Sequence, residues 1–122
     1  MKRVVTIQDI SCVGKCSLTV ALPIISAMGI ETAVIPTAVL STHTAFKNFT
    51  CRDLTNDLPK IANHWKQEKF EFDGIYTGYV GSIEQIDMLK EFFKQFKTSE
   101  NFIFIDPVMA DNGKLYAGFD TN

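Results

Sequence analysis

The chain has 122 residues, of which 46% are hydrophobic and 21% charged, a balance typical of one folded domain or part of one, and it excludes a disordered chain. Its 12 basic and 14 acidic residues give a formal net charge of -2, which offers no electrostatic basis for binding nucleic acid or an anionic membrane. The three cysteines, Cys12, Cys16 and Cys51, have neither disulfide nor zinc-site spacing and indicate reduced thiols in a cytoplasmic protein.

Four short apolar runs predict the strands, which start near residues 3, 32, 72 and 102. Runs rich in β-branched residues at 3–8 and 32–36 predict the first two strands, and a weaker run at 72–77 predicts the third. The fully apolar run at 102–105 predicts a parallel strand that is buried on both faces. This spacing favours right-handed βαβ units over hairpins, and it predicts an α/β fold with a mainly parallel sheet.

Three helices are expected between the strands, each from an apolar stripe at helical spacing. The first has Ser17 as N-cap and the stripe Leu18, Ala21, Leu22, Ile25 and Met28, and Pro23 is expected to kink it or shift its start. The second follows Asp53 as N-cap, with the stripe Leu54, Leu58, Ile61 and Trp65. The third opens with a capping box at 82–85 and has the stripe Ile86, Leu89, Phe93 and Phe96.

Two connections lie outside these elements. Residues 41–52 form a long connection, and long loops in compact domains are often functional. Residues 106–122 have turn chemistry but no helix, and the turn signal Asn112-Gly113 follows the last predicted strand rather than joining two strands. A parallel sheet without a closing helix would leave apolar surface uncovered, so we expect the first half of a larger α/β domain.

Polar residues follow the predicted strands, at the edge where open α/β sheets bind their ligands. Asp9 follows the first strand, and it either binds a polar ligand group or caps the first helix. Asp106 and Asp111 lie on a proline-stiffened turn after the last strand. Two carboxylates at this spacing suit Mg²⁺ and phosphate chemistry, although an ordinary loop with two solvated aspartates has the same pattern.

Four segments in chain order resemble one enzyme family: TIQD at 6–9, STHT at 41–44, TGY at 77–79 and DPVMAD at 106–111. The chain resembles the pyridoxal/pyridoxamine kinases, in the vitamin-kinase branch of the ribokinase-like superfamily, over essentially its whole length. The resemblance implies a three-layer α/β/α fold. It also implies that residues 1–122 form the N-terminal part of a single kinase domain, without the C-terminal ATP-binding part.

The activity implied by the resemblance is ATP-dependent phosphorylation of the 5′-hydroxymethyl group of pyridoxal, pyridoxamine or pyridoxine. It implies ATP and Mg²⁺ as cofactors, with a monovalent cation as a further candidate, and a homodimer when full length. Neither a nucleic acid nor a membrane is an expected partner. Two alternatives stay open: a hydroxymethylpyrimidine kinase of thiamine synthesis, and a non-catalytic half-domain.

The resemblance also assigns site residues. It places Asp9, His43, Thr44 and Tyr79 at the vitamin, and Asp106, Asp111 and Tyr116 near the nucleotide, with the two aspartates near its cations. Asp9 stands where the family usually has a serine, and a carboxylate there would pair with a charged amine or a pyridinium nitrogen. Ala45 and Ala110 also depart from the family pattern. The family's general base, an aspartate in a glycine-rich turn, has no counterpart here, so no catalytic base is expected in this chain.

Overall fold

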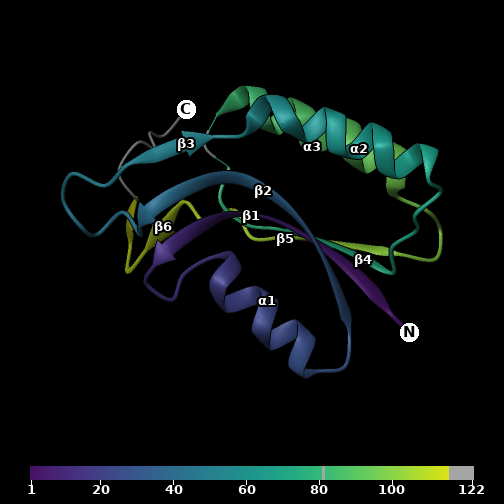
Figure 1. The fold of residues 1–122 in the computed structure, drawn as a ribbon, viewed down its shortest axis with the longest axis horizontal. Helices are drawn as coiled ribbons and strands as arrows, with labels where there is room; N and C mark the ends of the chain where they lie inside the picture. Colours follow the sequence, from purple (N-terminus) through teal and green to yellow (C-terminus); the bar gives the residue numbers. More distant parts are fainter. Residues whose placement is uncertain (81, 116–122) are drawn as a thin grey trace.

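The computed structural model describes residues 1–80 and 82–115. A five-stranded sheet of order β3-β2-β1-β4-β5 has α1 on one face and α2 with α3 on the other (Figure 1). The elements are β1 (Arg3–Val13), α1 (Leu18–Ala27), β2 (Glu31–Thr42), β3 (Cys51–Asp53), the 3-10 helix η1 (Thr55–Asp57), α2 (Leu58–Gln67), β4 (Gly74–Thr77), α3 (Ile83–Phe96), β5 (Phe102–Ile105), β6 (Ala110–Asp111) and β7 (Lys114–Leu115). The predicted three-layer α/β/α fold is confirmed, and none of the described helices has the length and apolar character needed to cross a membrane.

β1 and β2 extend well past the predicted strands and create the edge where the site lies. β1 pairs in parallel with β2 as far as Val13↔Thr42, whereas its pairing with β4 ends at Ile7↔Thr77. The predicted first strand ended at Gln8 because polar residues follow it, but pairing with β2 satisfies the backbone groups beyond that point. The last part of β1 therefore projects beyond the end of β4.

The hydrophobic core lies between the sheet and the α2–α3 layer, and aromatic rings fill its centre. The centroid of the Phe72 ring lies 5.4 Å from the centroids of both Trp65 and Phe96. Phe92 stacks on Phe96 at 4.6 Å and is fully buried. These contacts join the end of α3 to α2 and to the residues just before β4, so this face of the sheet is closed.

The stripe predicted for the third helix is partly wrong. Leu89 and Phe96 are buried as expected, but Ile86 is 42% exposed and Phe92, which the prediction omitted, is buried. Ile86 and Phe92 are both apolar, so the sequence does not decide between them. The packing of α3 against α2 buries Phe92. The second stripe is confirmed at Leu58, which is buried.

The helix starts differ in how well they match the predicted caps. Ser82 Oγ accepts a hydrogen bond from the Gln85 backbone N–H at 3.1 Å, so the predicted cap of α3 is confirmed. Asp53 Oδ1 accepts from the Thr55 N–H at 2.7 Å, but the N-cap residues of η1 and α2 are Leu54 and Asp57, so the predicted cap of the second helix is wrong. Ser17 occupies the N-cap position of α1 as predicted, but its side chain makes no capping hydrogen bond.

α1 is apolar around most of its circumference, which explains why its predicted inward stripe is only partly correct. Leu18 is buried, but Leu22 and Met28 are 36% and 69% exposed. Pro23 lies inside the helix without shifting its start from Leu18. α1 therefore leaves apolar side chains exposed, among them Ile24.

Two short pairings were not predicted. The connection at 41–52 contains the start of β3, which pairs antiparallel with β2 through Leu40↔Cys51. Asn112 and Gly113, with φ of 49° and 78°, join β6 to β7 in a hairpin, so the prediction that this pair joins no strands is wrong. Positive φ at both central residues is the geometry that an Asn-Gly turn adopts most readily.

β5 is not buried on both faces as predicted. Phe102, Phe104 and Ile105 are 58%, 57% and 56% exposed. β5 is an edge strand that pairs only with β4 in the described sheet, and the α1 layer lies toward β1 and β2. An apolar strand sequence alone does not reveal whether a neighbouring element covers it.

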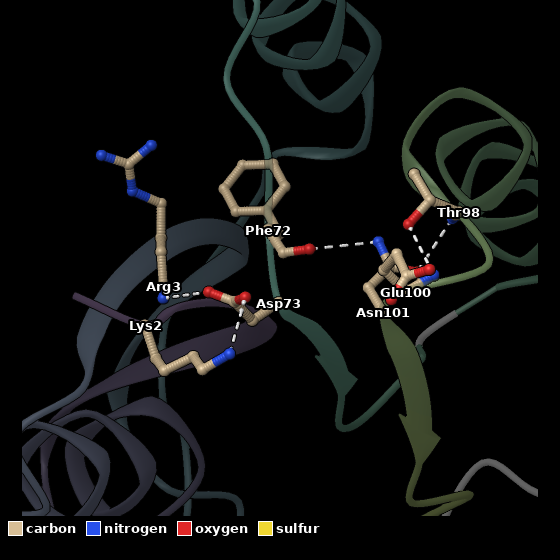
Figure 2. A network of polar contacts seen from close by, with 7 residues as sticks. All are labelled: Lys2, Arg3, Phe72, Asp73, Thr98, Glu100 and Asn101. Atoms are coloured by element: carbon tan, nitrogen blue, oxygen red, sulfur yellow. Dashed lines mark hydrogen bonds and ion pairs between the residues drawn. The ribbon is translucent and has the colours of Figure 1, made fainter.

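The amino edge of the sheet, opposite the site, is held by polar contacts (Figure 2). Asp73 Oδ2 accepts a hydrogen bond from the Arg3 backbone N–H at 2.8 Å, and Lys2 Nζ lies 3.5 Å from Oδ1. Asn101 Nδ2 donates to the Phe72 carbonyl at 3.1 Å, which links the start of β5 to the start of β4. These contacts fix the strands relative to one another at the edge opposite Asp9 and His43.

Candidate functional site

A cavity of about 460 Å³ opens at the carboxyl ends of β1 and β2. It brings together the four residues predicted to contact the vitamin: Asp9, His43, Thr44 and Tyr79. Asp9 comes from the projecting part of β1, and His43 and Thr44 come from the loop after β2. The remaining lining residues are Ser11, Cys16, Ser17, Leu40, Phe49 and Val108.

Asp9 lies within β1, only 7% exposed, and forms no hydrogen bond or ion pair with another residue that the structure describes. It therefore does not cap α1, which was the alternative interpretation. Ser11, two residues further along β1, is 1% exposed, and its Oγ has no hydrogen-bond partner among the described residues. Buried polar groups are nearly always paired, so two unpaired groups beside one cavity point to a ligand.

The His43 ring is held in a defined orientation at the cavity. Its Nδ1 accepts a hydrogen bond from the Ala45 backbone N–H at 3.2 Å, and its ring centroid lies 4.8 Å from that of Phe46. Because Nδ1 is an acceptor, the neutral ring carries its proton on Nε2, which leaves that nitrogen as the donor.

The negative charge of Asp9 in the cavity also acts on Cys51, a residue of β3. The pKa of the Cys51 thiol is raised, first by partial burial and then by the carboxylates of Asp53 and Asp9. All three cysteines are free thiols, as the sequence predicted. The Asp9 carboxylate thus affects the Cys51 thiol, which does not line the cavity. A ligand bound in the cavity would lie closer to this carboxylate and interact with its charge.

The two aspartates predicted at the nucleotide lie in different surroundings. Asp106 lines an adjoining cavity of about 380 Å³ between α1 and β4, which shares Cys16, Ser17, Tyr79 and Val108 with the first. Its Oδ1 accepts from the Val108 N–H at 3.0 Å. Asp111 is exposed on β6 and lines neither cavity, and Tyr116 lies outside the described residues.

Within residues 1–80 and 82–115 no cluster of three or more His, Cys, Asp or Glu side chains forms a metal site. Asp106 is the carboxylate that fits a cation beside bound phosphates, because Mg²⁺ commonly takes one or two protein carboxylates. Asp111 does not join it in either cavity, so the predicted pairing is not seen in the described structure.

Sequence reasoning missed several lining residues. Ser11 has a recognisable signal, because it alternates with Asp9 along an extended strand and must share its face. Ser17, predicted only as the N-cap of the first helix, occupies that position and also lines both cavities. Phe49 lies in the loop before β3 and has no distinguishing pattern, since only the folded loop places it at the cavity.

The chain was compared with known proteins, and no family model matches it. A protein of Bacteroides thetaiotaomicron, provisionally named a phosphomethylpyrimidine kinase, is 46% identical with a TM-score of 0.94, over 98% of this chain and 41% of that one. A second crystal form of that protein, with pyridoxal, gives a TM-score of 0.92. The pyridoxal kinase of Lactobacillus plantarum is 36% identical with a TM-score of 0.89, over 98% of this chain and 43% of that one.

A curated relative from Schizosaccharomyces pombe, provisionally named a pyridoxal kinase, is 29% identical over 121 residues, which are 94% of this chain and 38% of the relative. The chain therefore spans about two fifths of the length of these relatives. The resemblance seen in the sequence motifs is confirmed: in sequence and in fold, this chain matches the pyridoxal kinases, a phosphotransferase family, over the part of them that it spans.

Proposed function

We propose that this chain forms the vitamin-binding part of a kinase that transfers a phosphoryl group from ATP to the 5′-hydroxymethyl group of pyridoxal, pyridoxamine or pyridoxine. The observation that supports this most is the cavity that collects Asp9, His43, Thr44 and Tyr79. Polar groups from β1 and the loop after β2 line this cavity together with Tyr79 and Phe49, a combination suited to a small polar heterocycle. A relative with 46% identity has been crystallised with pyridoxal.

In this proposal the nucleotide lies beside the smaller cavity. Asp106 is the residue that would hold a magnesium ion accompanying ATP, with Oδ1 already oriented by the Val108 N–H. The ion would neutralise phosphate charge, as it does in phosphoryl transfer generally. Asp111 and Tyr116 stay predictions for the same nucleotide.

We further propose that residues 1–122 are the N-terminal part of a single ribokinase-like domain in a cytoplasmic homodimer. The exposed apolar side chains of β5, Phe102 and Phe104, support a continuation of the fold over that edge. The two-fifths coverage of the relatives agrees with this division. The general base and the rest of the ATP site would then come from outside these residues.

Hydroxymethylpyrimidine kinase is the second candidate, because the relative at 46% identity carries a phosphomethylpyrimidine kinase name. Both substrates are small heteroaromatic rings with a hydroxymethyl group, and the cavity would admit either. Comparing the two substrates in one assay separates the candidates.

The test is a chimera in which this chain replaces the matching two fifths of the Bacteroides thetaiotaomicron protein. We expect ATP-dependent phosphorylation of pyridoxal, and we expect Thr44→Val to lower kcat/KM by about tenfold through loss of one hydrogen bond. Thr50→Val, at an exposed threonine of the same loop, is the matched control. A folded chimera that phosphorylates only hydroxymethylpyrimidine supports the second candidate, and one that phosphorylates neither substrate contradicts both.

A further inference from the structure

Asp9 and Ser11 form a pair on the same face of β1. Side chains two residues apart on a strand point to the same side, and their Cα atoms lie about 6.6–6.8 Å apart. Both line the 460 Å³ cavity, and both are more than nine-tenths buried. Side chains at this spacing can hydrogen-bond, as Gln8 Nε2 and Thr6 Oγ1 do at 2.7 Å on the same strand, but Asp9 and Ser11 form no hydrogen bond with each other.

Neither member of the pair has a partner within the described structure. The Ser11 hydroxyl makes no hydrogen bond, and Asp9 makes no hydrogen bond or ion pair. A buried hydroxyl without a partner costs folding free energy, and a carboxylate at a cavity wall without a partner contributes none. Neither Asp9 nor Ser11 therefore adds to the stability of the fold, which favours a role for the two residues in binding.

The rest of the cavity wall defines what the pair can bind. No lysine or arginine is among the lining residues, and the one histidine uses Nδ1 as an acceptor toward the Ala45 N–H. The carboxylate therefore has no protein cation to neutralise it there. Leu40 and Phe49 contribute apolar surface beside it, which suits the ring of a heteroaromatic ligand.

We infer that Ser11 is a specificity-determining residue, and that with Asp9 it binds the primary ammonium of the substrate. An ammonium has three hydrogens, so one donates to the Asp9 carboxylate while another donates to Ser11 Oγ. A ring N–H has a single hydrogen and cannot bridge the two oxygens. The pair thus selects an aminomethyl-substituted ring, such as pyridoxamine, over one with a neutral substituent; the identity of this ligand rests on the proposed function.

The test measures two quantities on the 122-residue chain and on Ser11→Ala. The first is the ratio of dissociation constants for pyridoxine and pyridoxamine, obtained by NMR titration, which detects millimolar binding. We expect the chain to prefer pyridoxamine by about tenfold, and Ser11→Ala to reduce that preference by about threefold or more while leaving the affinity for pyridoxine unchanged. Asp9→Asn should abolish the preference.

The second quantity is the free energy of unfolding in urea. Since Ser11 has no partner in the described fold, Ser11→Ala should leave this free energy unchanged or raise it. Ser26→Ala, at an exposed serine of α1 outside both cavities, is the matched control for the ligand ratio. A purely structural Ser11 would instead lose stability on substitution and keep the ligand ratio.

Equal affinities for the two ligands, or no binding of either at 20 mM or about that concentration, would overturn the inference. So would a stability loss in Ser11→Ala with an unchanged ratio. Each of these results would contradict the role of Ser11 only, and the proposed function would still hold if the chimera phosphorylates pyridoxal. A chimera that phosphorylates no vitamin, while the chain still prefers pyridoxamine through Ser11, would contradict the function and keep the binding site.

Discussion

Gly14 and His43, which lines the 460 Å³ cavity, lie in direct contact, and only a residue without a side chain fits at position 14. Gly14 has a φ of 103°, and a Cβ built on it would stand 2.3 Å from Cδ2 of His43. The His43 backbone N–H donates to the Val13 carbonyl at 3.3 Å, which joins the loop after β2 to the end of β1. The position of the His43 ring therefore depends on a glycine in the other strand's connection.

Gly14→Ala should lower the free energy of unfolding by about 2–4 kcal/mol, because backbone strain adds to the clash with His43. Gly29→Ala is the matched control: its φ is 78°, but a Cβ there has no atom within 4 Å. It should cost only about 1–2 kcal/mol. Urea unfolding measures both, and equal losses would contradict the contact with His43.

Phe92→Ala should destabilise the chain by about 3–5 kcal/mol, since it removes a fully buried ring that stacks on Phe96. Phe102→Ala removes a ring that is 58% exposed, and it should change the free energy of unfolding by about 1 kcal/mol or less. The comparison is made by thermal or urea unfolding. A larger loss at Phe102 than at Phe92 would mean that the exposed face of β5 is covered in solution.

Asp73 should make stability depend on pH in the acid range. Its pKa is lowered from 3.8, chiefly by the hydrogen bond from the Arg3 backbone N–H and also by the Lys2 charge. Because the folded-state pKa lies below the unfolded one, the stabilisation is present above 3.8 and is lost as the pH falls through the folded-state value. Asp73→Asn should flatten the stability profile below pH 4 or thereabouts, and an unchanged slope would show that this hydrogen bond is absent.

Cys51 should alkylate more slowly in the folded chain than in the unfolded chain at pH 8 or about that value, because its raised pKa lowers the thiolate fraction. Asp53→Asn and Asp9→Asn each remove one of the charges that raise this pKa, so each should speed the reaction. Iodoacetamide labelling followed by peptide mass spectrometry resolves Cys51 from Cys12. No acceleration in Asp9→Asn would contradict the effect of its charge on this thiol.

The fold class could be predicted because strand and helix periods alternate along the chain, and the capping residue Ser82 was recognisable for a local reason. The errors have non-local causes. β1 continues past Gln8 because β2 pairs with it, and Phe92 replaces Ile86 in the core because α2 decides which apolar stripe packs. Asn112-Gly113 was recognised as a turn, but its flanking strands are too short to show a periodicity.

The candidate site was only partly predictable. Asp9, His43, Thr44 and Tyr79 follow strands, and the topology of a parallel sheet brings such residues to one edge. Ser11 was missed because the predicted first strand ended at Gln8, so its alternation with Asp9 along β1 was not considered. Asp111 was grouped with Asp106 by sequence spacing, but the β6–β7 hairpin places it outside both cavities.

The most direct test of the central claim, that the carboxyl-edge cavity is the vitamin site, is an NMR titration of this chain with pyridoxal. The account predicts chemical-shift changes at the amides of Asp9, His43 and Thr44, with none at Arg3 and Asn101 on the opposite edge. Shifts confined to that opposite edge, or no shift at any residue, would contradict it.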